Sequence, residues 1–164
     1  PPATMNFLTE HSIGSYEELV ERCDAVSAAS IRTRENLRDT EQRITDLALL
    51  GKQIDTYRKL KPVYDRYKAS KDKEKFLRGF ESEIILFEAA AREIKKAGLA
   101  KLPSSDKLKA ELDGLSARKT ALQTELRKIQ REEKEYDTLR QNVEALLEKP
   151  REAEPQRQRN HELE

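Results

Sequence analysis

The sequence has no tryptophan, a single cysteine and only two histidines, and these absences narrow the chemistry that the chain can carry. One cysteine, Cys23, cannot form an internal disulfide, and this usage fits a reducing compartment. His11 and His161 lie near opposite ends of the sequence, so they do not predict a histidine metal site. We expect no catalytic residue, no metal and no other cofactor in this chain.

The sequence also lacks long apolar runs and a glycine-rich phosphate loop. Its first residues, PPATMNFLTEHSIG, have neither the basic lead nor the apolar core of a signal peptide. They do not resemble the start of a natural protein either, and we expect the chain to be a piece cut from a longer one. We expect a cytoplasmic protein that makes no membrane contact.

What remains is charge and helical periodicity, with 38% charged and 36% apolar residues and only five glycines. This balance suits long helices that each bury a narrow stripe, and it does not suit a round globule. We predict an all-α fold, a long antiparallel helical hairpin (coiled coil) with a short helical tip. The alternative is a three-helix up-down-up bundle, in which the middle helix runs back along the rod.

The first half predicts an extended arm or linker over residues 1–14 and a helical coiled-coil domain over residues 15–148. Ser15 and Glu18 form a capping box, in which Glu18 reaches back to the N–H of Ser15. A seven-residue repeat then runs from Tyr16 to Lys61 as a loosely filled seam. Pro62 is expected to kink or end this helix near Lys61.

The second half predicts a helical tip over residues 62–104, with caps at Asp72 and Ser104 and a glycine stop at Gly98. Ile85 and Leu86 broaden one helix face, which indicates packing on more than one side. A heptad pattern from Leu108 to Leu147 predicts the last helix, which Pro150 should end. Residues 149–164 are predicted to be disordered. Antiparallel pairing would bring Leu37 near Tyr136, Ile44 near Ile129, and Leu47 near Leu126.

The charge is concentrated in residues 58–78, where nine Lys or Arg oppose three Asp or Glu, a net charge of +6. Such a field attracts phosphate backbones without reading bases. An acidic protein partner and a merely solvated tip remain open as alternatives. The tip is also expected to receive Arg92, Lys95, Lys96, Lys101, Lys107 and Lys109. The candidate nucleic-acid contacts are Arg58, Lys59, Lys61, Arg66, Lys68, Lys71, Lys73 and Lys75.

Two other features are interpreted as packing. Cys23 lies on the apolar stripe, where a small core residue is expected far more often than a nucleophile. Tyr57, Tyr64 and Tyr67 share one helical flank and are interpreted as packed rings. The many carboxylates, interleaved with lysines and arginines, indicate a solvated ion-pair face.

Several stretches resemble the C-terminal region of relaxases (mobilization nucleases) from plasmids and conjugative elements of Gram-positive gut bacteria. They are FLTEHSIGSYEELVERCD, VYDRYKASKDKEKFLRGFESEIILFEAAAREIKKAG and KLPSSDKLKAEL. The resemblance covers residues 7–147. It implies a bacterial helical region downstream of a DNA-nicking domain, whose catalytic tyrosine and histidine-bound metal have no counterpart here. Contacts with DNA, with relaxosome proteins or with coupling proteins are the functions that it implies.

We therefore expect a non-catalytic helical module of a DNA-mobilization relaxase, a monomer or weak dimer. The alternatives are a generic coiled-coil scaffold for protein interaction and a stand-alone nucleic-acid-binding helical arm. An enzyme in its own right is the least favoured alternative, because no catalytic constellation is apparent.

Overall fold

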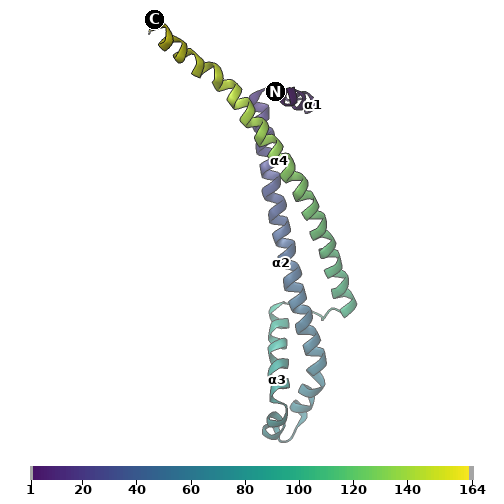
Figure 1. Cartoon of the computed structure of the whole chain (residues 1–164). Coiled ribbons are helices and arrows are strands. Elements are labelled where there is room, and N and C mark those ends of the chain that lie inside the picture. The colour runs from purple at the N-terminus through teal and green to yellow at the C-terminus, as the bar shows by residue number, and fades with distance from the viewer. Residues whose placement is uncertain (1, 163–164) are drawn as a thin grey trace. The chain divides into compact units, whose positions relative to one another are not determined.

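The computed structural model describes the backbone of residues 2–162 and the side chains of residues 3–148. The described chain contains α1 (Pro2–Glu10), α2 (Tyr16–Ala69), α3 (Lys73–Lys96) and α4 (Ser105–Glu162), with no strand (Figure 1). The predicted all-α class is confirmed. In place of a single helical domain there are two compact units. We call residues 1–37 with 121–164 the terminal unit, and residues 38–120 the central unit.

Helix α2 begins at the predicted capping box, with one change of partner. The N–H of Glu18 donates to Ser15 Oγ at 3.2 Å, as expected. The Glu18 carboxylate, however, accepts from the N–H of Gly14 at 2.7 Å and not from Ser15. Glu18 thus binds the backbone of Gly14, the residue before the N-cap Ser15. This hydrogen bond fixes the direction in which the chain enters α2.

Three other predicted helix boundaries, at Asp72, Gly98 and Ser104, are confirmed. Asp72 caps α3, because its carboxylate accepts from the N–H of Lys75 at 3.1 Å. Ser104 caps α4, because its hydroxyl accepts from the N–H of Lys107 at 3.1 Å. Gly98 follows α3 with φ +68°, a left-handed conformation that a residue with a Cβ adopts at a cost.

The extended arm predicted for residues 1–14 is wrong, because residues Pro2–Glu10 form helix α1. The helix ends in a Schellman motif, in which the N–H of Ile13 donates to the Leu8 carbonyl at 2.9 Å. Ser12 takes the left-handed position of this motif, with φ 54°. Leu8 and Ile13 also pack against the core of the terminal unit, so tertiary contact stabilises a helix too short to form alone.

In the terminal unit, α2 and α4 pack with antiparallel chain directions around a core of Leu19, Cys23, Tyr136 and Leu139. Cys23 is buried, and its Sγ lies 3.8 Å from the Tyr136 carbonyl oxygen. Burial raises the pKa of this thiol, which keeps it protonated and unreactive. The predicted core role of Cys23 is confirmed. The partly buried residues around this core are Phe7, Leu8, Ile13, Val26 and Val143.

The predicted seams are confirmed, but their register is wrong. Tyr136 packs with Leu19 and Cys23, and not with Leu37. Leu47 packs with residues at the start of α4, and not with Leu126. The expected pairing of Ile44 with Ile129 belongs to the same incorrect register. The second core, in the central unit, consists of Leu47, Ile54 and Leu108, with Leu50, Ile94, Leu102, Leu112 and Leu115 around it.

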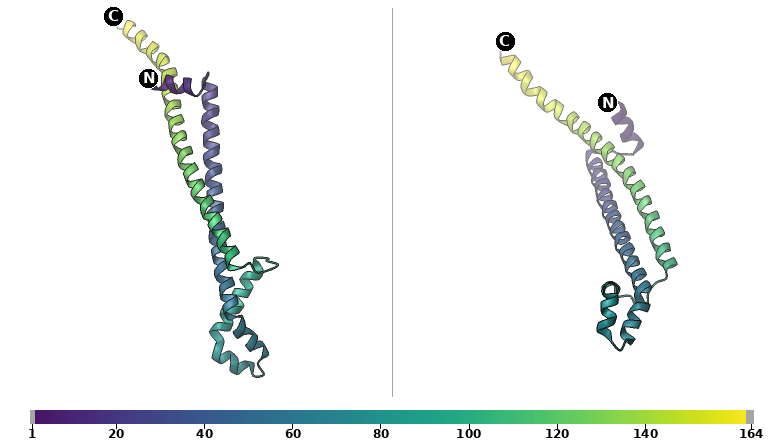
Figure 2. Two further views of the ribbon diagram at one scale, coloured as in Figure 1. Left: turned by 90° about the vertical axis from the view of Figure 1, so that its right-hand side faces the viewer. Right: turned by 60° about the horizontal axis from the view of Figure 1, so that its bottom comes forward.

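Helix α3 explains the shift in register. It runs back along the end of α2, as the further views show (Figure 2), and Ile94 near its end joins the core around Ile54. The chain has therefore returned to the level of Ile54 before α4 begins. The hairpin prediction placed this start close to Pro62, so it shifted every later pair along α2. Within the central unit, α3 and the start of α4 both run antiparallel to α2, so the three segments do not follow the up-down-up order of the alternative (Figure 1).

Pro62 does not end α2, which continues to Ala69. A proline inside a helix removes one backbone hydrogen bond, and packing on either side can offset that loss. Phe87 of α3 supplies such packing, because it stacks on Tyr57 before the proline and on Tyr64 after it. The ring centroids lie 4.8 Å and 4.3 Å apart, respectively.

The predicted stop at Pro150 is also wrong, because α4 extends to Glu162. The disordered tail expected over residues 149–164 is therefore helical as far as Glu162, and its side chains lie outside the described residues. A proline removes one backbone hydrogen bond from a helix, and in this long helix that loss does not end it.

Replacing Ser30 with alanine is expected to raise the free energy of unfolding by about 1–2 kcal/mol. Ser30 is 1% exposed, and its hydroxyl has no hydrogen-bond partner among the described residues. The variant would remove a polar group that is desolvated in the folded state and hydrated in the unfolded state. Urea unfolding of the Ser27→Ala variant is the matched control, because Ser27 lies on the same helix with its hydroxyl 3.5 Å from Glu133. Equal gains in both variants would reduce the effect to helix propensity alone.

Candidate nucleic-acid interface

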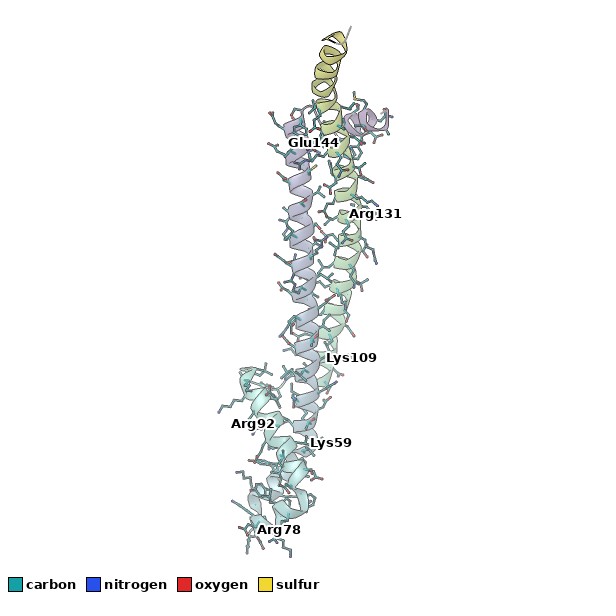
Figure 3. All side chains as sticks on the ribbon, turned by 60° about the vertical axis from the view of Figure 1, so that its left-hand side comes forward. Lys59, Arg78, Arg92, Lys109, Arg131 and Glu144 are labelled. Carbon is teal, nitrogen blue, oxygen red and sulfur yellow. The ribbon has the colours of Figure 1, made fainter. Side chains whose placement is uncertain are left out.

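The eight predicted cations all belong to the central unit, but they do not form one cluster. Lys68, Lys71, Lys73 and Lys75 lie on either side of the turn between α2 and α3, and we call them the turn group. Arg58, Lys59 and Lys61 lie earlier on α2, seven or more residues before Lys68. At about 1.5 Å per residue this is an axial separation of roughly 10 Å or more. Figure 3 shows Lys59 well away from Arg78, the cation nearest the turn that it labels.

Arg58 has a role that the sequence did not predict. Its Nη2 donates to the Pro103 carbonyl oxygen at 2.6 Å, which ties the connector before α4 to α2. Lys61 pairs with Asp65 at 3.2 Å on the surface of α2. Lys59 is exposed. Of these three residues, Lys59 is the best placed to meet a ligand, because the other two already have protein partners.

Arg66 and Lys68 rest against aromatic rings. The Arg66 guanidinium carbon lies 5.6 Å from the ring centroids of both Phe76 and Phe80, which stack on each other at 4.8 Å. The Lys68 ammonium lies 5.4 Å from the centroid of Tyr64. These cation–π contacts orient the two side chains and leave their positive charge intact.

The remaining members of the turn group are exposed and have no ion-pair partner among the described residues. No described carboxylate lies within ion-pair distance of Lys71, Lys73 or Lys75. The adjacent Asp72 accepts a backbone hydrogen bond at the start of α3, where it balances the positive end of the helix dipole. The turn group therefore presents its charge to solvent, where it can meet an anionic partner.

The tyrosines pack as predicted. Tyr57 and Tyr64 stack on Phe87, and Tyr67 lies 6.1 Å from Phe76 between ring centroids. These rings join α3 to the end of α2 next to the turn that carries the turn group. The aromatic rings therefore contact one another and also the side chains of Arg66 and Lys68.

The cations from Arg92 to Lys109, which we expected to lie at the tip with the turn group, do not reach the turn. That prediction is wrong. In Figure 3, Arg78 lies at one end of the central unit, Arg92 lies further along, and Lys109 lies beyond it. The reason is that α3 has 24 residues and carries the later cations back along α2. Lys96 also pairs with Glu93 at 3.2 Å, which lowers its value as a free cation.

The terminal unit contains a polar cluster with a structural role. The Tyr16 hydroxyl donates to Glu144 Oε1 at 2.6 Å, and Arg140 Nε donates to the same oxygen at 3.0 Å. These two hydrogen bonds, that from Tyr16 foremost, lower the pKa of Glu144. The same carboxylate raises the pKa of Tyr16. The cluster links the start of α2 to α4.

The described residues contain no group of three or more histidine, cysteine, aspartate or glutamate side chains that could hold a metal ion. Nor does any helix in this part of the chain have the length and apolar content needed to cross a bilayer. Comparison of the chain with protein-family models, curated proteins and solved structures found no match.

Proposed function

We propose that this chain is a non-catalytic helical module of a DNA-mobilization relaxase, acting in the bacterial cytoplasm. In this proposal, the turn group contacts the phosphate backbone of DNA weakly and without reading its sequence. The resemblance of residues 7–147 to relaxase C-terminal regions supports the relaxase assignment. The DNA contact has separate support in the charge and geometry of the turn.

One observation carries the DNA contact. Lys71, Lys73 and Lys75 stand exposed within five residues, with no carboxylate partner among the described residues. Lysines in such a cluster repel one another, and a nearby phosphate relieves that repulsion while condensed counterions are released. The rings of Phe76 and Phe80 stack on each other, and the Arg66 guanidinium lies against both. The exposed lysines are point charges, which suit binding to phosphates without reading bases.

The test is to change Lys68, Lys71, Lys73 and Lys75 together to glutamine and to measure binding to a fluorescein-labelled duplex. Anisotropy would be recorded between about 20 and 200 mM salt, where counterion release dominates affinity. We expect the salt slope to become shallower by up to about 3.6, because each lost phosphate contact removes roughly 0.9. Circular dichroism should show unchanged helix content.

The matched control changes four exposed lysines outside the turn to glutamine, namely Lys52, Lys109, Lys128 and Lys134. It removes the same charge, so a shallower slope in this variant would show that the field of the whole chain, and not the turn, binds DNA. If the unmodified chain fails to bind the duplex at the lowest salt, the DNA contact is wrong. The turn group would then be assigned to an acidic surface on a relaxosome or coupling protein.

A further inference from the structure

A second feature of the central unit, distinct from the turn group, is a pocket of about 890 Å³. It lies among α2, the end of α3, the connector and the first turns of α4. Two leucines at the pocket are unusually exposed, Leu49 at 55% and Leu99 at 39%. The other leucines that line it are Leu47, Leu50, Leu102 and Leu108. An open apolar surface of this kind gains free energy when another apolar group covers it.

The charged residues around these leucines are mainly basic. Three carboxylates line the pocket, and one of them, Glu93, is already paired with Lys96. Arg58 donates to the neutral carbonyl of Pro103 and so keeps its full charge. The pocket therefore favours an apolar group flanked by carboxylates. The five cations that line it are Arg43, Arg58, Lys96, Lys101 and Lys107.

The same unit carries a surface with the opposite character. On α3, Ile84, Phe87 and Ala90 are buried, whereas Ile85 and Leu86 are 54% and 55% exposed. The sequence indicated that this helix packs on more than one side, yet no described residue covers the second side. Residues 81–91 contain three glutamates, Glu81, Glu83 and Glu88, and no cation. We call Ile85, Leu86 and these glutamates the acidic ridge.

We infer that the acidic ridge of one copy of this chain docks in the leucine pocket of a second copy. Both partners are apolar at the centre, and their flanking charges are opposite. The ridge cannot enter the pocket of its own chain, because α3 continues beyond Leu86 as regular helix and itself forms one wall of that pocket. The only non-helical position within α3, Phe80, precedes Ile85, so it offers no hinge between ridge and pocket.

This interface joins two different surfaces, so it is heterologous, and its contact area is small. We therefore expect weak association, with a dissociation constant on the order of 0.1–1 mM. Sedimentation velocity of the full chain over this concentration range should show reversible self-association.

Two variants test the two surfaces separately. The ridge variant, Ile85→Lys with Leu86→Lys, places cations against the basic pocket. The pocket variant, Leu49→Glu with Lys101→Glu, places carboxylates against the acidic ridge. Each alone should lose at least about tenfold in association constant. Ile31→Lys is the control for surface charge, because Ile31 is 56% exposed and lies outside both surfaces, and it should associate like the unmodified chain.

Mixing the two variants gives the decisive result. The ridge variant retains an intact pocket and the pocket variant retains an intact ridge, so an equimolar mixture should form one-to-one heterodimers. The free surfaces of these heterodimers carry introduced charges of opposite sign but have lost apolar side chains, so we expect them to add further copies more weakly than the unmodified chain does. A monomeric unmodified chain at about 1 mM, or a mixture that stays monomeric, would overturn the inference. Self-association that neither variant weakens would do the same.

Discussion

Replacing Ile54 with alanine is expected to lower the free energy of unfolding by about 2–5 kcal/mol. Ile54 is fully buried, with 0% of its surface exposed, and it packs with Leu47 of α2 and Leu108 of α4. Ile94 of α3 joins the same core. Truncation would remove apolar surface at a position where α2, α3 and α4 pack together. Because three helices surround the position, they cannot easily move together to close the resulting cavity.

Urea unfolding followed by circular dichroism measures this effect. The matched control is Ile85→Ala, because it makes the same chemical change in the same unit at a position that is 54% exposed. That control should change stability by less than about 0.5 kcal/mol. If Ile54→Ala costs no more than Ile85→Ala, the three helices do not meet at Ile54.

The heptad seam illustrates what sequence periodicity can predict. The seam positions of the heptad repeat on α2, spaced alternately by four and three residues from Leu19 to Ile54, are all buried or half-buried. They include the small polar residues Ser30 and Thr33. Periodicity works here because burial within one helix depends only on its own repeat. The repeat contains no information on which turn of the partner helix lies opposite, and the register prediction failed for that reason.

The register depended on where the chain reverses, and a long-range contact decides that. Phe87 stacks on Tyr57 and Tyr64, on either side of Pro62. These contacts stabilise α2 beyond the proline and pack α3 against it. A local rule about proline could not include this contact. Helix α1 was missed for a related reason, since its nine residues show no clear repeat and it depends on packing against the terminal core.

For the candidate nucleic-acid interface, too, the sequence predicted local properties and missed long-range contacts. The exposure of Lys71, Lys73 and Lys75 followed from composition, because a lysine-rich turn has no apolar residue to bury. The contact between Arg58 and the Pro103 carbonyl did not follow, because it joins residues that are 45 positions apart. The sequence therefore identified the charges correctly and misplaced those whose position depends on the return of α3.

The second large effect is expected from replacing Phe87 with alanine, which should cost about 3–5 kcal/mol of stability in the central unit. Phe87 is 5% exposed and lies between two tyrosine rings, with centroid distances of 4.8 Å to Tyr57 and 4.3 Å to Tyr64. Its loss would remove the side chain that joins α3 to α2 on both sides of Pro62. We expect α3 to detach before the rest of the unit unfolds.

Hydrogen exchange distinguishes this local effect from global destabilisation. Amides of α3 should exchange much faster in the Phe87→Ala variant, while those around Leu19 in the terminal unit should be nearly unchanged. Phe76→Ala is the matched control, because Phe76 is only half-buried and stacks on Phe80 near the start of α3. It should accelerate exchange less, and mainly near the turn.

The same variant links the fold to the proposed DNA contact. Lys73 and Lys75 lie on α3, and Lys68 lies on α2, so their spacing depends on the aromatic contacts that Phe87 makes. Phe87→Ala changes no charge, yet it should weaken duplex binding at low salt, because dispersed lysines engage fewer phosphates at once. Unchanged DNA affinity together with fast exchange in α3 would show that the lysines act as independent charges, and that the folded turn adds nothing to their binding.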